Sequence, residues 1–145
     1  MELHEVKALV DLAVANLRAT QPNLHDFTPA TLQTEWNIAH HLACEIKELF
    51  PDHDCDLDVS KPNLNNMRPD IIIHERGNHD NNLLVIEVKR DAVDIWEDVT
   101  KITGFWFDAP LNYQFGAVVA INEYADPVVE VFETLRSADQ ASKAR

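Results

Sequence analysis

The sequence is poor in cysteine, glycine and long apolar runs, and each shortage excludes a class of protein. It has 2 cysteines, Cys44 and Cys55, so neither a disulfide framework nor a structural zinc site with four clustered ligands is expected. Only 3 glycines and 7 prolines argue against a disordered or fibrous chain. There is no apolar run of membrane-spanning length and no secretory signal pattern at the N-terminus. We therefore expect a soluble, cytoplasmic protein that does not interact with a membrane.

Basic residues are also scarce. The chain has 12 Lys and Arg against 25 Asp and Glu, which gives a net charge of −13. An acidic surface of this kind repels phosphate backbones at a distance and weakens non-specific binding of nucleic acid. Any contact with nucleic acid must therefore be local, metal-assisted or supplied by a partner protein.

What is present suits a single folded domain. A hydrophobic content of 46% is enough for one core, and a chain of 145 residues is too short for a second independent core. We divide the chain into an N-terminal helix and loop (1–29), a core (30–132) and a tail (133–145) whose end looks frayed or helical.

Hydrophobic periodicity predicts three helices and five strands. The expected helices span residues 2–18, 30–50 and 91–107. The expected strands span residues 53–60, 70–75, 83–90, 115–121 and 128–132. This order, α-α-β-β-β-α-β-β, predicts an α/β protein, and the unbroken apolar run 115–121 is typical of a strand covered on both faces.

Two charged residues interrupt the apolar strand 83–90. Glu87 and Lys89 share one face of that strand, because strand side chains alternate. Burying charges there is costly unless they are paired or bound to a metal. Asp70 opens the preceding strand, and a hairpin through residues 77–82 can bring it beside Glu87.

Glu35 offers a third carboxylate. It alone among the acids of helix 30–50 falls on the apolar stripe, which continues through Ala39, Leu42, Ile46 and Leu49. If that helix packs on the sheet, Glu35 can join Asp70, Glu87 and Lys89. Such oxygen ligands suit Mg²⁺ or Mn²⁺, which takes one or two carboxylates, several waters and substrate phosphate. The ion can polarise a phosphoryl oxygen and activate water, and a lysine nearby can stabilise the developing negative charge.

At these residues the chain resembles the PD-(D/E)xK nuclease superfamily, in particular its small bacterial and phage-type members. The matching segments are Arg68-Pro69-Asp70-Ile71-Ile72-Ile73 and Val85-Ile86-Glu87-Val88-Lys89. The resemblance implies a restriction-endonuclease-like core, with a mixed central sheet flanked by helices. It implies that Asp70 and Glu87 are metal ligands and Lys89 the catalytic lysine. It further assigns Glu35 and Val88 to the metal site and Lys101 to an accessory position.

The resulting hypothesis is a Mg²⁺-dependent nuclease that cuts DNA or, as second choice, RNA; a homodimer is left open. The alternative is a nuclease-fold module with weak or no catalysis that binds a protein partner, for example as a subunit of a larger defence or mobile-element complex. The complete motif favours the first and the charge of −13 favours the second.

Each feature also has a purely structural interpretation. Glu87 and Lys89 can form a simple ion pair on an exposed sheet, and Glu35 can extend to the edge of its helix. His74, on the same strand face as Asp70, can touch substrate, but we favour a structural histidine. Two sets of acids are expected to form solvated faces: Asp54, Asp56 and Asp58; and Asp91, Asp94, Glu97 and Asp98. The three tryptophans, Trp36, Trp96 and Trp106, are expected in the core.

Overall fold

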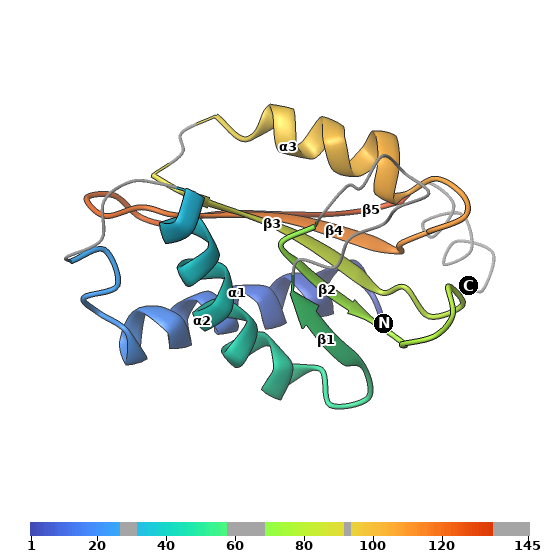
Figure 1. Cartoon of the computed structure of the whole chain (residues 1–145), viewed down its shortest axis with the longest axis horizontal. Helices are drawn as coiled ribbons and strands as arrows, with labels where there is room; N and C mark the ends of the chain where they lie inside the picture. Colours follow the sequence, from blue (N-terminus) through green and yellow to red (C-terminus); the bar gives the residue numbers. More distant parts are fainter. Residues whose placement is uncertain (27–31, 58–68, 92–93, 135–145) are drawn as a thin grey trace.

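A five-stranded sheet with helices on both faces organises the chain (Figure 1). Helices α1 (Leu3–Thr20) and α2 (Leu32–Leu49) cover one face, and α3 (Trp96–Lys101) covers the other. The computed structural model describes residues 1–26, 32–57, 69–91 and 94–134. The α/β class and the mixed sheet flanked by helices, both expected from the sequence, are confirmed.

The sheet follows the chain in order. Its strands are β1 (Asp54–Leu57), β2 (Ile71–His74), β3 (Leu84–Arg90), β4 (Phe115–Ile121) and β5 (Val128–Glu133). Among these strands, β3 and β4 pair in parallel and every other neighbouring pair is antiparallel. A parallel pair needs a crossover, which α3 and the π-helical turn Ile102–Trp106 supply. In the β2–β3 register Ile71 lies opposite Ile86, so Asp70 arrives beside Glu87.

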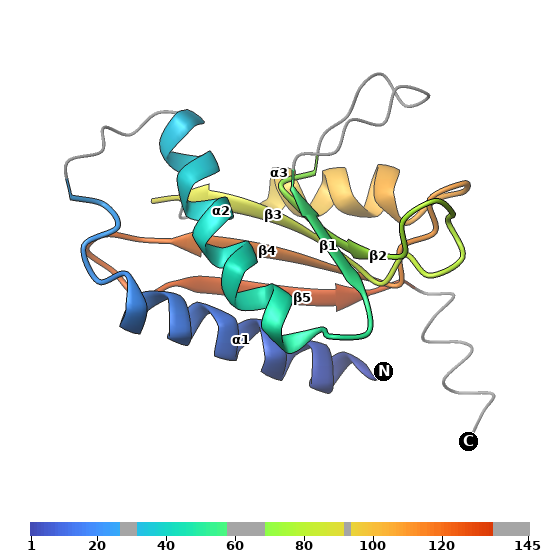
Figure 2. The same ribbon diagram turned by 60° about the horizontal axis from the view of Figure 1, so that its bottom comes forward.

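Two apolar cores hold the layers together. In the larger core, α1 runs along β5 and α2 crosses β1 and β3 (Figure 2). Helix α1 contributes its helically spaced stripe, Val6, Val10, Ala13, Val14 and Leu17. Helix α1 is therefore an integral part of the larger core. The smaller core packs Ile102 and Trp106 against Val85 and Val118.

Several sequence expectations need correction. The expected helix 91–107 is an α-helix only over Trp96–Lys101 and continues as the π-helical turn. Trp106 is buried as expected, but Trp36 and Trp96 are 54% and 74% exposed, so placing them in the core was wrong. Strand β5 extends to Glu133, one residue into the expected tail. Residues 30–31, 58–60, 92–93 and 135–145 of the expected elements lie outside the described part of the chain.

None of the helices in the described ranges combines the length and apolarity that crossing a membrane requires.

Candidate active site

Asp70 and Glu87 meet on adjacent antiparallel strands, on the sheet face that α3 covers. Asp70 immediately precedes β2, and its Oδ2 accepts a 2.7 Å hydrogen bond from the backbone N–H of Val88. That bond orients the Asp70 carboxylate toward β3. The side chain of Glu87 is only 5% exposed. The strand pairing expected from the sequence therefore brings two carboxyl groups together in a largely dry environment.

The electrostatics of this pair are unfavourable in the absence of a cation. Burial raises the pKa of Asp70, and it raises the pKa of Glu87 as well. The negative charge of Asp70 raises the pKa of Glu87 further. The interaction between the two carboxyl groups also lowers the pKa of Asp70 while it raises that of Glu87. Two such groups resist being ionised together, which is the situation that a bound cation relieves.

Lys101, on the last turn of α3, lies beside this pair. Its Nζ is 3.4 Å from Glu87 Oε1, and its charge lowers the pKa of both Glu87 and Asp70. The two groups are at ion-pair distance, yet Oε1 is buried with no hydrogen-bond partner among the described residues. An oxygen in this state retains an unused lone pair, with which it can accept a hydrogen bond or bind a cation.

Lys89 is held by a residue that the sequence analysis placed elsewhere. Its Nζ lies 3.6 Å from Asp98 Oδ1, and Asp98 is buried, so assigning Asp98 to a solvated face was wrong. Burial lowers the pKa of Lys89, but the carboxylates of Asp98 and Glu35 outweigh it, so the pKa is raised and the ammonium group stays charged. The sequence did contain a pattern that indicates burial of Asp98. This residue lies three positions after Ile95 and four before Ile102, on the apolar stripe of the helix.

Glu35 reaches the same region from the opposite face of the sheet. It sits in the first turn of α2, which lies near the carboxyl end of β3 (Figure 1). Its side chain is half-buried, and its negative charge raises the pKa of Asp70 and of Lys89. The structure thus brings Glu35, Asp70, Glu87, Lys89 and Lys101 into one electrostatic cluster.

His74 lies apart from that cluster. It ends β2, whereas Asp70 precedes it, and its Nε2 is 2.6 Å from Asp56 Oδ2. The guanidinium of Arg76 donates to both oxygens of Asp56, at 2.9 and 2.6 Å. The favoured structural role for His74 agrees with this geometry. Asp54 and Asp56 are partners of Arg76 rather than a purely solvated face, and Asp58 lies outside the described residues.

The donor set suits a small, hard cation better than a cation that needs many protein ligands. Within residues 1–26, 32–57, 69–91 and 94–134, no group of three or more His, Cys, Asp and Glu side chains is arranged to hold a metal ion. Mg²⁺ usually takes one or two carboxylates and keeps several waters. The neighbouring carboxyl groups of Asp70 and Glu87 fit that requirement, because Glu87 Oε1 has an ion-pair partner but no hydrogen bond.

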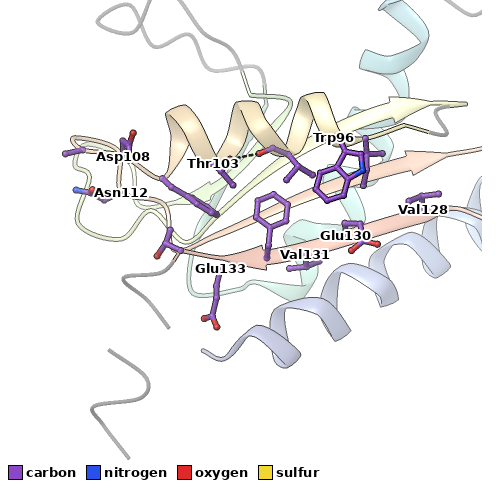
Figure 3. Close-up of a pocket in the computed structure, with 14 residues that line it drawn as sticks. Trp96, Thr103, Asp108, Asn112, Val128, Glu130, Val131 and Glu133 are labelled. Carbon is purple, nitrogen blue, oxygen red and sulfur yellow. Dashed lines mark hydrogen bonds between the residues drawn. The ribbon is translucent and has the colours of Figure 1, made fainter. Parts of the chain in front are cut away.

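A separate hollow lies on the other side of α3, between this helix and β5. In Figure 3, Trp96 of α3 and Thr103 of the π-helical turn that follows it face Val131 and Glu130 of β5. The cavity measures about 1100 Å³, and the described residues that line it are mainly apolar. Among these, Asp108, Glu130 and Glu133 are acidic and none is a lysine, arginine or histidine. None of the charged residues of the Asp70–Glu87 cluster lines it.

Comparison with known proteins gives no match: no family model, no curated protein and no solved structure matches the chain. Since a fold does not determine a function, function has to be inferred from the chemistry of the site. Two neighbouring carboxyl groups, one buried and one half-buried, with two lysines beside them are suited to binding a cation and to stabilising negative charge on a substrate.

Proposed function

We propose that the protein is a Mg²⁺- or Mn²⁺-dependent nuclease that hydrolyses phosphodiester bonds, with DNA as the preferred substrate. One observation carries the proposal: half-buried Asp70 lies beside buried Glu87, and Glu87 Oε1 has no hydrogen-bond partner among the described residues. A purely structural pair of acids would be expected to have its lone pairs satisfied. Two carboxyl groups that resist being ionised together, one of them with a buried oxygen that lacks a hydrogen bond, are better explained by a cation that binds there.

Each residue of the cluster has a distinct proposed role. Asp70 and Glu87 bind the ion, which supplies Lewis-acid chemistry and an activated water when present. The Val88 backbone N–H keeps Asp70 oriented, and Asp98 keeps Lys89 in place. The Lys89 ammonium group, whose raised pKa keeps it charged, orients water and stabilises negative charge developing on the phosphate. Glu35 adds a third negative charge near the ion.

The resemblance to the PD-(D/E)xK superfamily supports this assignment. The element order α-α-β-β-β-α-β-β agrees with the restriction-endonuclease-like core that the resemblance implies. The matching residues also lie where a shared site requires them, Asp70 at the start of β2 and Glu87 and Lys89 on β3. DNA is named as substrate on the strength of this resemblance.

A cleavage assay tests the proposal. Purified protein is incubated with single- and double-stranded DNA and with RNA, in Mg²⁺, in Mn²⁺ and in excess chelator. We expect cleavage of DNA that requires the divalent ion and is lost in Asp70→Asn and Glu87→Gln, which preserve shape and remove a metal ligand. Cleavage that persists in chelator, or in both variants, would reject this site as the catalytic centre.

A second candidate function is a protein-interaction module of nuclease fold, acting within a larger complex. It is favoured by the apolar hollow between α3 and β5, on whose lining the large side chain of Trp96 is 74% exposed. Contiguous exposed apolar surface often marks a protein interface, and tryptophan is enriched among residues that dominate binding energy. The net charge of −13 also fits a chain whose nucleic-acid contacts are made by a partner.

The two candidates differ in which residues matter. If partner binding is the main function, Trp96→Ser should abolish association with that partner while Asp70→Asn leaves it intact. If catalysis is the main function, Asp70→Asn should abolish activity while Trp96→Ser, at an exposed side chain outside the charged cluster, leaves it unchanged. The same two variants, assayed for cleavage and for co-purification, therefore separate the candidates.

A further inference from the structure

The cluster around Glu87 contains two ion pairs, each between a residue of β3 and a residue of α3. Strand β3 presents Glu87 and Lys89, two residues apart, on one face. Helix α3 faces them with Asp98 and Lys101, three residues apart. Each acid therefore meets a base: Lys101 lies 3.4 Å from Glu87, and Lys89 lies 3.6 Å from Asp98.

The two lysines differ in what a bound cation would do to them. The partner of Lys89 is Asp98, which has no proposed role in metal binding. The partner of Lys101 is Glu87, a proposed metal ligand, and the buried oxygen Oε1 is the atom that Lys101 approaches. A divalent ion bound to that oxygen would lie within a few ångströms of the Lys101 ammonium group, and like charges at such a separation repel strongly in a poorly solvated site.

The exposed fractions of the Lys101 and Glu87 side chains indicate which of the two can move when a cation binds. The side chain of Lys101 is 39% exposed, whereas that of Glu87 is 5% exposed. A long lysine side chain at a surface can move its charged end into water at small cost. Glu87, fixed on a central strand between β2 and β4, cannot move away. Departure of Lys101 is therefore the simplest way to admit a cation.

We propose that Lys101 is the resident counter-ion of Glu87 and that the catalytic divalent ion displaces it. This inference rests on the proposed metal-dependent function. The lysine neutralises part of the charge of the metal-free site and competes with the incoming ion for the same carboxylate. Metal affinity is then set by a competition between two cations, and Lys101 lowers it.

Direct measurement of Mn²⁺ binding by titration calorimetry tests the proposal without any activity assay. At constant pH we expect Lys101→Met, which has a side chain of similar length and no charge, to bind Mn²⁺ about tenfold more tightly than wild type. Lys101→Arg retains the charge and should remain close to wild type. Lys7→Met on α1 makes the same change in net charge on the opposite face, where Lys7 pairs with Asp11, and should have little effect.

The outcomes separate this inference from the proposed function. If wild type binds Mn²⁺, Asp70→Asn does not, and Lys101→Met binds no more tightly than wild type, the displacement proposal is overturned while the metal site stands. An equal gain in Lys7→Met would also overturn it, because the effect would then come from net charge. If wild type and Asp70→Asn bind Mn²⁺ alike, the proposed function fails together with this inference. Circular dichroism of each variant confirms that it is folded.

Discussion

Two clusters of charged side chains lie on the same sheet face, at opposite ends of β2. At the start of the strand, Asp70 is paired with Glu87. At its end, Asp56 of the neighbouring strand β1 is bonded to His74 and Arg76. Both clusters are built around carboxylates, yet their electrostatics are opposite. Burial raises the pKa of Asp70, whereas the hydrogen bond from Arg76 lowers the pKa of Asp56 to about 2.

The difference follows from the balance of charges and from access to water. Asp56 has a guanidinium bonded to both of its oxygens, and it is partly solvated, so its ionised form is favoured. The charge of Asp56 is therefore compensated by its own neighbours, without an additional ion. Glu87 is buried and Asp70 half-buried, and the nearby Lys101 lies at ion-pair distance from Glu87 alone of the two. The pair of Asp70 and Glu87 is stable as a dianion only with an additional cation, which is why we place the functional site there.

The largest expected effect concerns catalysis. Lys89→Ala should reduce the metal-dependent cleavage rate at least about a hundredfold, because removing one group that stabilises transition-state charge typically costs that much. The rate is measured at saturating Mg²⁺ and with excess substrate. Asp56→Asn, in the other cluster, is the matched control and should cleave at the wild-type rate. Equal rates in Lys89→Ala and wild type would contradict the assignment of Lys89.

A second expectation concerns metal binding by the folded protein. Saturating Mn²⁺, at about 100 times its dissociation constant, should raise the melting temperature of wild type by about 5 to 10 °C. Asp70→Asn has lost a ligand and should gain much less, whereas Asp56→Asn should gain as much as wild type. An equal gain in Asp70→Asn would mean that the ion acts on diffuse surface charge.

The two clusters should also respond with opposite sign when one charge is removed in chelator. Asp70→Asn relieves repulsion from Glu87, so the free energy of unfolding should stay the same or rise. Asp56→Asn weakens the bonds to Arg76 and His74, so the free energy of unfolding should fall by about 1 kcal/mol. Urea denaturation at neutral pH measures both. A clear loss of stability in Asp70→Asn would show that its charge is already compensated without metal.

The smallest expected effect is the pH dependence of the Asp56 cluster. Its folded pKa of about 2 lies below the ordinary value of 3.8, so the stabilisation it provides is fully present above about pH 4 and is lost as the pH falls toward 2. The difference in unfolding free energy between wild type and Asp56→Asn should therefore shrink between pH 5 and pH 2, by an amount limited by solvent screening. A difference that stays constant over this range would argue against the Arg76 bond.

Local patterns in the sequence predicted most of the elements and the placement of several charged residues. The alternation of β3 placed Glu87 and Lys89 on one face, and the short hairpin connection implied that Asp70 would arrive beside Glu87. The apolar stripe of α2 marked Glu35 as an exceptional acid. These inferences hold because strand and helix periodicity are local properties that each segment retains in the folded chain.

Which base meets which acid was decided by tertiary structure. The position of α3 over the sheet turned Asp98 from an expected surface acid into the partner of Lys89, and Lys101 into the partner of Glu87. The same placement left Trp96 exposed beside the hollow next to β5. Periodicity defines the faces of a helix but not how far each face is covered, because coverage depends on where the helix lies on the sheet. The sequence alone therefore determined the strands and the placement of their charged residues, because alternation is local, and the packing of one short helix decided which acid meets which base.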